Sequence, residues 1–251
     1  MKKIYFSLFL TFLVNSLYSQ TCSFMIGGNF TSGNLLSYGL NLRANLNSNP
    51  EKTNQIVFIP SFDYGMISNQ SGDFELRRRE TLSVLNYERS NKRFKFYVYN
   101  EIENSFLRKI QLRSSFGTGI SYKLISNEKT NFDISQFVLP EIFLSSFSNK
   151  KDNWAIRIST RIRLSKKIGR YKYSSQILLQ PSVYTQLSDG RTVTLKDNTN
   201  IRWNTSYEYV FSKNLSVGFT GDLTIQTYTS FINPQVKPYD TNFNLFIKGS
   251  F

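Results

Sequence analysis

Hydrophobic and polar residues alternate with a period of two along much of this chain. In residues 154–164, Trp154, Ile156, Ile158, Thr160, Ile162 and Leu164 alternate with Ala155, Arg157, Ser159, Arg161 and Arg163. Successive side chains of a β-strand point to opposite faces, whereas a helix repeats its apolar positions every three or four residues. The segment is therefore predicted to be a strand with one apolar and one charged face.

Residues 94–99 and 215–226 have the same two-faced pattern, with apolar side chains on one face and polar or charged ones on the other. A soluble β-sandwich would bury the apolar face between two sheets, whereas a membrane barrel turns it to lipid and encloses the polar face. Because charged side chains recur along the polar face, the pattern favours a membrane barrel.

Turn-forming residues divide the chain into regular segments and fall into two alternating sets. The first set, assigned to the periplasmic end, is Asn-Ser-Asn-Pro at 47–50, Ser-Asn-Lys at 90–92, Ser-Asn-Glu-Lys at 126–129, Lys-Lys-Ile-Gly at 166–169 and Ser-Lys-Asn at 212–214. The second set is Thr-Ser-Gly-Asn at 31–34, Asn-Gln-Ser-Gly at 69–72, Glu-Asn-Ser near 103, Asn-Lys-Lys-Asp at 149–152, Asp-Gly near 189 and the prolines of 233–238. Together they predict an all-β fold, a single transmembrane antiparallel up-and-down β-barrel of about 12 strands over residues 21–251, with both ends in the periplasm.

Residues 1–20 have the features of a secretory signal peptide. Lys2 and Lys3 precede an apolar run from Leu8 to Val14, and a polar stretch follows. The run is too short for a spanning helix, which needs about 20 apolar residues. We expect cleavage near Ser19 or Gln20 and export to the bacterial outer membrane.

The chain is strongly basic, with a formal net charge of +14 and a pI of about 9.8. Such a charge would suggest nucleic acid as a partner in a cytoplasmic protein, but export excludes that partner here. The expected partners are outer-membrane lipid and lipopolysaccharide, whose phosphates attract cations. The oligomeric state is left open by the sequence.

The absence of histidine restricts the chemistry that the chain can perform. The sequence has no histidine and a single cysteine, Cys22. Ser-His and Cys-His nucleophiles, His-ligated zinc, His-ligated haem and an internal disulfide are all excluded. We therefore predict no catalytic activity, no metal site and no cofactor.

The C-terminal residues resemble the signal by which the barrel-assembly machinery recognises its clients. Phe243, Leu245, Ile247 and the terminal Phe251 share one face of a last strand, although Gly249 stands where a large residue is usual. This machinery is accordingly an expected partner during biogenesis.

Two blocks of sequence resemble a family of outer-membrane barrels. The first is Gly28-Asn29-Phe30-Thr31-Ser32-Gly33-Asn34, and the second runs from Phe94 through Tyr99, Glu101, Phe106, Leu107, Arg113, Gly117, Gly119 and Tyr122 to Leu124. The chain is similar in these blocks to the family that includes the salt-induced outer membrane protein of enteric bacteria. The resemblance implies a closed barrel of about twelve strands and assigns no catalytic residues.

The alternation assigns many charged residues to the barrel interior. The candidate lumen charge cluster is Arg113, Arg157, Arg161, Arg163, Arg202, Glu101, Glu141, Glu208 and Asp222. Arg43, Lys95, Lys123, Lys172, Lys248, Asp63, Glu103 and Asp133 share its face, so the interior is expected to be mildly basic. These side chains either line an anion-preferring pore or pair with one another across the lumen and fill it. A barrel of about twelve strands lies between small filled barrels and open porins, and the many long inward side chains favour a filled or very narrow lumen.

Three smaller motifs have structural interpretations. Glu101 and Glu103 share one face and are expected to pair with arginine rather than act as acid and base. Gly117 and Gly119 lie within a strand and are expected to make room for large interior side chains. Arg77, Arg78 and Arg79 lie near an outer loop, where they either hold lipopolysaccharide phosphates or form a solvated charge cluster.

The sequence thus favours a structural or stress-responsive envelope protein without catalytic turnover. The alternative is a narrow channel for small solutes, with a preference for anions.

Overall fold

The computed structural model describes residues 21–32, 37–48, 53–68, 74–91, 93–105, 110–145, 153–186, 193, 195–227 and 237–250. The signal peptide expected at 1–20 and the terminal Phe251 lie outside these residues.

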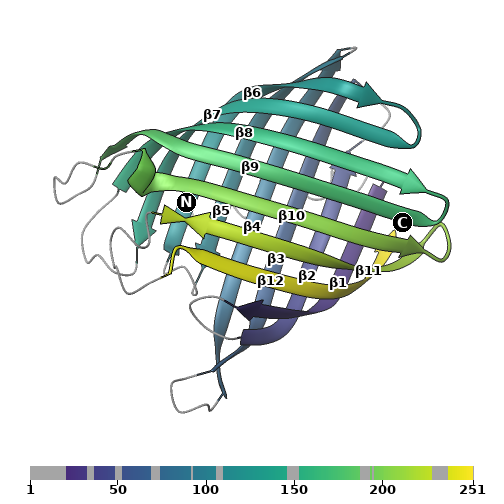
Figure 1. The fold of residues 1–251 in the computed structure, drawn as a ribbon, viewed down its shortest axis with the longest axis horizontal. Coiled ribbons are helices and arrows are strands. Elements are labelled where there is room, and N and C mark those ends of the chain that lie inside the picture. Colours follow the sequence, from purple (N-terminus) through teal and green to yellow (C-terminus); the bar gives the residue numbers. More distant parts are fainter. Residues whose placement is uncertain are drawn as a thin grey trace, which may run out of the picture.

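The described chain forms twelve strands and one short 3₁₀ turn, η1. The strands are β1 (Thr21–Ser32), β2 (Ser37–Ser48), β3 (Asn54–Ser68), β4 (Phe74–Asn91), β5 (Phe94–Ser105), β6 (Ile110–Ser126), β7 (Thr130–Ser145), β8 (Asn153–Ile168), β9 (Tyr171–Gln186), β10 (Thr199–Val210), β11 (Leu215–Gln226) and β12 (Tyr239–Ser250), with η1 at Lys196–Asn198. Each strand pairs antiparallel with its neighbours in sequence, and β1 pairs with β12 to close the barrel (Figure 1). The predicted barrel of about twelve strands is confirmed.

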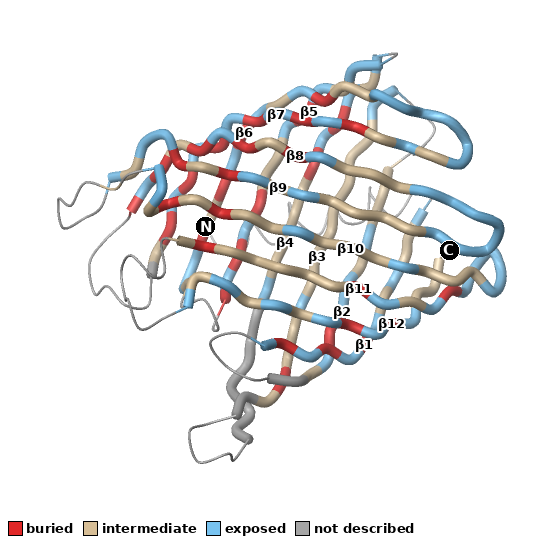
Figure 2. The backbone as a smooth tube through the Cα atoms, viewed as in Figure 1, coloured by how far each residue is buried: buried red, intermediate tan, exposed pale blue. Residues whose placement is uncertain are grey.

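The barrel is apolar on its outer surface and polar inside, which is the reverse of the distribution in a soluble protein. Outward positions are apolar and exposed: Ile142, Val138 and Ile134 on β7 are 36–55% exposed. The inward positions between them are buried and often charged, and the two classes alternate along the strands (Figure 2). An apolar exterior of this extent is stable only in contact with hydrocarbon, so the barrel crosses a membrane through its strands. Within the described residues, no helix has the length and apolar character needed to cross a membrane.

Aromatic side chains form a ladder on the outer surface of β9 to β12. Tyr173 and Tyr207 have ring centroids 4.8 Å apart, and Tyr207 stacks on Phe219 at 4.9 Å. Phe219 continues the stack to Phe243 at 5.8 Å. Such rings are typical of the aromatic girdles at membrane interfaces. Phe243 therefore contributes to the outer surface, together with Leu245 and Ile247.

Three described turns, at residues 127–129, 169–170 and 211–214, lie at or beside positions of the first set of turn signals. Asn127 forms one of them: its Oδ1 accepts hydrogen bonds from the backbone N–H groups of Lys129 and Thr130, at 3.0 and 2.7 Å. Gly169 lies in another, with a φ of 58° that favours glycine.

The turn predicted near residue 103 is wrong. Glu103 and Ser105 belong to β5 and are 1% and 0% exposed. The polar composition of Glu-Asn-Ser is typical of a turn, but inside this barrel a polar side chain is also what an inward position needs. The strand continues to Ser105 because the Glu103 carboxylate has a partner in the interior, Arg113.

Gly117 and Gly119 provide space on the inner wall, as predicted. A Cβ on Gly119 would lie 2.7 Å from Cγ of Phe137, and one on Gly117 would lie 2.8 Å from a methyl carbon of Leu139. Phe137 and Leu139 form a buried cluster with Tyr97, against which Tyr99 packs. The glycines of β6 thus allow large side chains of β7 to lie against the wall.

Replacing Gly119 with alanine should destabilise the barrel by about 1–3 kcal/mol, the usual cost of overpacking. Gly221→Ala is the matched control, because a Cβ at Gly221 has its nearest neighbour at 3.6 Å, an ordinary contact. Urea titration measures the stability of both refolded variants. The heat-modifiable band on a denaturing gel reports the folded fraction at each urea concentration. Equal stability of the two variants would contradict the packing role of Gly119.

An arginine on the outer surface should cost more free energy at mid-strand than at a strand end. Ile158→Arg places the charge near the middle of β8 and should destabilise the folded barrel by about 2–4 kcal/mol, whereas Ile168→Arg beside the turn should cost about 0–1 kcal/mol. Refolding titrations in lipid vesicles measure the difference. Similar costs at both positions would mean that Ile158 does not face hydrocarbon.

Candidate lumen site

Arg113 joins three strands at the inner wall through three carboxylates. Its Nη2 lies 2.9 Å from Glu101 Oε1 and also pairs with Glu103, both on β5. Its Nε lies 3.9 Å from Glu141 Oε2 on β7. These four side chains are only 1–6% exposed. Glu101 and Glu103 therefore pair with an arginine, as expected from the sequence.

Arg157 extends the same network to the start of β10. Two of its nitrogens donate to Glu141 Oε1 at 2.9 and 3.0 Å. The remaining nitrogen, Nη1, donates to the backbone carbonyls of Gln180 and Asn198, both at 3.1 Å. Nη2 donates in addition to Asn198 Oδ1 at 2.7 Å. A buried guanidinium needs this degree of hydrogen bonding because its desolvation is costly. Arg157 thereby fixes η1 against β8 and β9.

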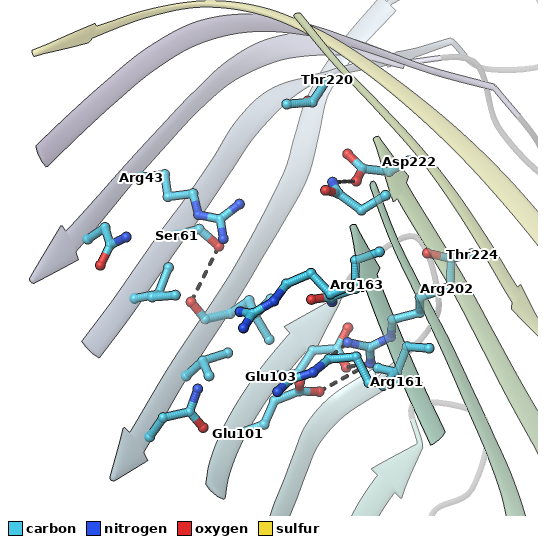
Figure 3. A pocket seen from close by; sticks show the side chains of 18 of the residues that line it. Arg43, Ser61, Glu101, Glu103, Arg161, Arg163, Arg202, Thr220, Asp222 and Thr224 are labelled. Carbon is cyan, nitrogen blue, oxygen red and sulfur yellow. Dashed lines mark hydrogen bonds and ion pairs between the residues drawn. The ribbon is translucent and has the colours of Figure 1, made fainter. Parts of the chain in front are cut away.

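Arg202 crosses the lumen. It projects from β10, and its Nη2 donates to Glu101 Oε1 at 3.1 Å and to Glu103 Oε2 at 3.4 Å on β5. Four strands, β6 to β9, separate β5 from β10 around the barrel. The bridge therefore spans the interior rather than a neighbouring strand pair (Figure 3).

Other ion pairs lie apart from this network. Arg163 Nη2 lies 2.9 Å from Asp133 Oδ2, and Lys95 lies 3.1 Å from Glu88. Glu208 is 3.2 Å from Lys172 and 3.4 Å from Lys248. Asp222 instead accepts hydrogen bonds from Asn204 and Asn244. The interior thus brings together Arg113, Arg157, Arg202, Glu101 and Glu141, with Glu103, and leaves Arg163, Glu208 and Asp222 in separate clusters.

Arg161 lies against aromatic rings. Its guanidinium carbon is 5.0 Å from the ring centroids of both Tyr97 and Phe137, and Nη2 donates to Ser135 Oγ at 3.2 Å. Together with the Tyr97 cluster, it fills the part of the lumen beside β5 to β8.

A cavity of about 750 Å³ occupies the remaining interior. Its charged lining residues are Arg43, Lys95, Arg161, Arg163 and Arg202 with Asp63, Glu88, Glu101, Glu103, Asp222 and Asp240. Five cations face six carboxylates among the described lining residues, so the predicted basic excess does not extend to the cavity wall.

Glu88 and Asp240 were missed by the sequence reasoning. Leu82 and Val84 precede Glu88 on its face of β4, while Leu85 and Tyr87 are on the other face, so alternation does not distinguish the two faces. Asp240 lies two residues after the predicted turn at 233–238, at the start of β12. In β4, the two polar residues Asn86 and Glu88, two positions apart and therefore on one face, were the signal available.

Two predicted features have limited structural counterparts. The side chains of Arg77, Arg78 and Arg79 lie outside the described part of the structure. Of the terminal pattern, Phe243, Leu245 and Ile247 are 45–61% exposed on the outer face, whereas Phe246 points inward and is 5% exposed.

Across the described residues, no group of three or more His, Cys, Asp or Glu side chains is arranged to hold a metal.

The chain is similar to solved structures of outer-membrane barrels. The NanC porin is 8% identical, with a TM-score of 0.55, and the match covers 89% of this chain and 98% of that one. The KdgM porin is 9% identical, with a TM-score of 0.47 and coverage of 90% and 99%. An anion-selective porin from Comamonas acidovorans is 8% identical, with a TM-score of 0.43 and coverage of 92% and 99%. At these identities the likeness concerns the fold.

No curated protein sequence matches the chain. A family model does match, over residues 25–245, which include nearly all of the barrel from β1 to β12. The chain belongs to the family described as protein of unknown function, DUF481.

Proposed function

We propose that this protein is a narrow, non-catalytic channel of the bacterial outer membrane for small polar solutes. The observation that carries the proposal is the cavity of about 750 Å³ inside a closed barrel, with charged and amide side chains on its wall. A barrel that served only as a scaffold would have no need of a polar cavity. Filling that space with side chains would satisfy its buried polar groups more simply.

The interior also explains why the channel is narrow. The Arg202 bridge to Glu101 and Glu103 crosses the lumen, and Arg161 packs with Tyr97 and Phe137 beside it. These side chains reduce the open width of the lumen beside β5 to β8. Conductance should therefore be well below that of large porins, whose sixteen or more strands leave open water.

The proposal includes no catalysis. Glu101 and Glu103, the carboxylates closest to an acid and base pair, are each in contact with both Arg113 and Arg202. Carboxylates held in such ion pairs stabilise the wall and are poorly suited to transfer protons. The histidine-free sequence agrees with this assignment.

A structural or stress-responsive envelope role is the second candidate. The ion pairs of Arg113, Arg157 and Arg202 support it, because they fill much of the lumen as they would in a barrel without transport. The resemblance to the salt-induced outer membrane protein of enteric bacteria fits the same role. Outer-membrane lipid, lipopolysaccharide and the barrel-assembly machinery are the partners proposed in either case.

Cell fractionation tests the proposed location. The mature chain should be found in the outer-membrane fraction and should migrate faster on a denaturing gel before boiling than after it, because a closed barrel resists unfolding by detergent. Removing Phe251 should reduce the heat-modifiable fraction if the terminal aromatic residue is read by the assembly machinery. A protein that is soluble in the periplasm and unchanged by boiling would contradict the proposed location.

Planar-bilayer recording tests the channel against the structural role. The wild-type barrel should give small, reproducible current steps, and Arg202→Ser should give clearly larger ones because it removes the side chain that crosses the lumen. Lys172→Ser is the matched control: it also removes an inward cation, but Lys172 does not contribute to the cavity wall or the cross-lumen bridge. Absence of current steps from both wild type and Arg202→Ser would favour the structural role.

A further inference from the structure

Arg161 differs from the other buried arginines of the barrel. Arg113 and Arg157, like Arg161, are at most 8% exposed, and both lie within ion-pair distance of carboxylates. Among the described residues, no carboxylate lies within 4.0 Å of the Arg161 guanidinium, and its Nε has no hydrogen-bond partner. Within the described residues, Arg161 therefore has no ion-pair partner.

The surroundings of Arg161 hold its side chain in place without cancelling its charge. Tyr97 and Phe137 each present a ring 5.0 Å away, and Ser135 accepts one hydrogen bond. Cation–π contacts stabilise a guanidinium by much less than the cost of burying an unpaired charge. An anion that binds at the guanidinium would remove most of that cost.

Arg161 also lies at the wall of the cavity, where such an anion can reach it (Figure 3). The neighbouring Arg163 and Arg202 are engaged by Asp133 and by Glu101 with Glu103. On another part of the wall, Arg43 has Asp63 and Asp222 nearby. Among the described arginines of the cavity wall, Arg161 is the buried one without an ion-pair partner.

Much of the remaining wall consists of amide side chains. They include Asn41, Asn45, Asn86, Gln176, Gln180 and Asn204. An amide both donates and accepts hydrogen bonds, so it complements hydroxyl groups of either orientation. Cavities of about 300–1,000 Å³ hold small organic ligands, and this one falls within that range.

We propose that the cavity binds a small hydroxylated carboxylate, with its carboxylate on Arg161 and its hydroxyl groups on the amide wall. The proposal rests on the proposed function, because it names the class of solute that the channel would take up. The planar fork of a guanidinium matches a carboxylate better than an ammonium does. Arg161 would therefore select a carboxylate by its geometry as well as by its charge.

Calorimetric titration of the full-length mature protein, refolded in detergent, tests the site with three probes. Gluconate carries both a carboxylate and hydroxyl groups, hexanoate carries only the carboxylate, and sorbitol carries only hydroxyl groups. Gluconate should bind the wild type more tightly than either of the others. Arg161→Met keeps most of the side-chain volume over the two rings. It should weaken gluconate binding about tenfold or more, because it removes the charged hydrogen-bond donor.

Two further variants separate a binding role from a packing role. Lys172→Met removes one inward cation outside the cavity wall and should leave gluconate affinity unchanged. Arg161→Lys should recover part of the affinity lost in Arg161→Met, because it restores the charge without the fork. The heat-modifiable band must be retained in every variant before its titration is compared.

The outcomes distinguish this proposal from the channel itself. Wild-type protein that does not bind gluconate, or folded Arg161→Met that binds it as tightly as wild type, would overturn the proposal even if the barrel conducts ions. Equal binding of gluconate and hexanoate would overturn the role of the amide wall. If Arg161→Met abolishes gluconate binding but the wild-type barrel gives no current steps, the binding site is supported. Only the proposed channel function would then be contradicted.

Discussion

Closure of the sheet is the constraint on which the rest of this structure depends. Hydrocarbon offers no partner to a backbone N–H or C=O group, so a sheet can cross a membrane only when it has no free edge. Here the first and last strands meet that requirement through a continuous register, from Ser23 opposite Ser250 to Ser32 opposite Thr241. Closure in turn forces every strand to present one face to lipid and the other to an enclosed space. The alternation of apolar and polar residues follows from this geometry.

An enclosed polar face creates a second problem, which ion pairs solve. Inward arginines and glutamates lose much of their hydration, and a buried charge is tolerated only when it is paired and hydrogen-bonded. Arg113 and Arg157 meet this condition through Glu101, Glu103 and Glu141. The ion pairs also link neighbouring strands to one another on the inner face. On the outer face the strands contact fluid lipid, which offers no specific partner. The same side chains that stabilise the wall therefore reduce the width of the lumen.

The sequence predicts the faces of the strands well and the partners of the inward residues poorly. Residues 154–164 show why the faces are predictable: the charge pattern of β8 is set by the two environments alone. By contrast, the contact between Arg202 and Glu101 joins residues 101 positions apart on strands separated by four others. It depends on barrel diameter and strand tilt, which no local pattern encodes. Glu103 was assigned both to an inward face and to a turn, because polarity alone cannot distinguish an enclosed polar face from a solvated loop. Glu88 was missed for a related reason, since both faces of β4 carry apolar residues near it.

The division of the interior connects stability to function. Beside β5 to β8, carboxylates and arginines neutralise one another and aromatic rings fill the remaining space, so that region serves the fold. The cavity lies against this filled region, and its wall includes a buried arginine, Arg161, that has no ion-pair partner among the described residues. A fully paired interior would be more stable but would attract no solute, because paired charges present little net field to the cavity. A chain under selection for stability alone would be expected to pair or replace such a residue. The position of Arg161 beside a polar cavity is therefore an argument for a role in solute recognition.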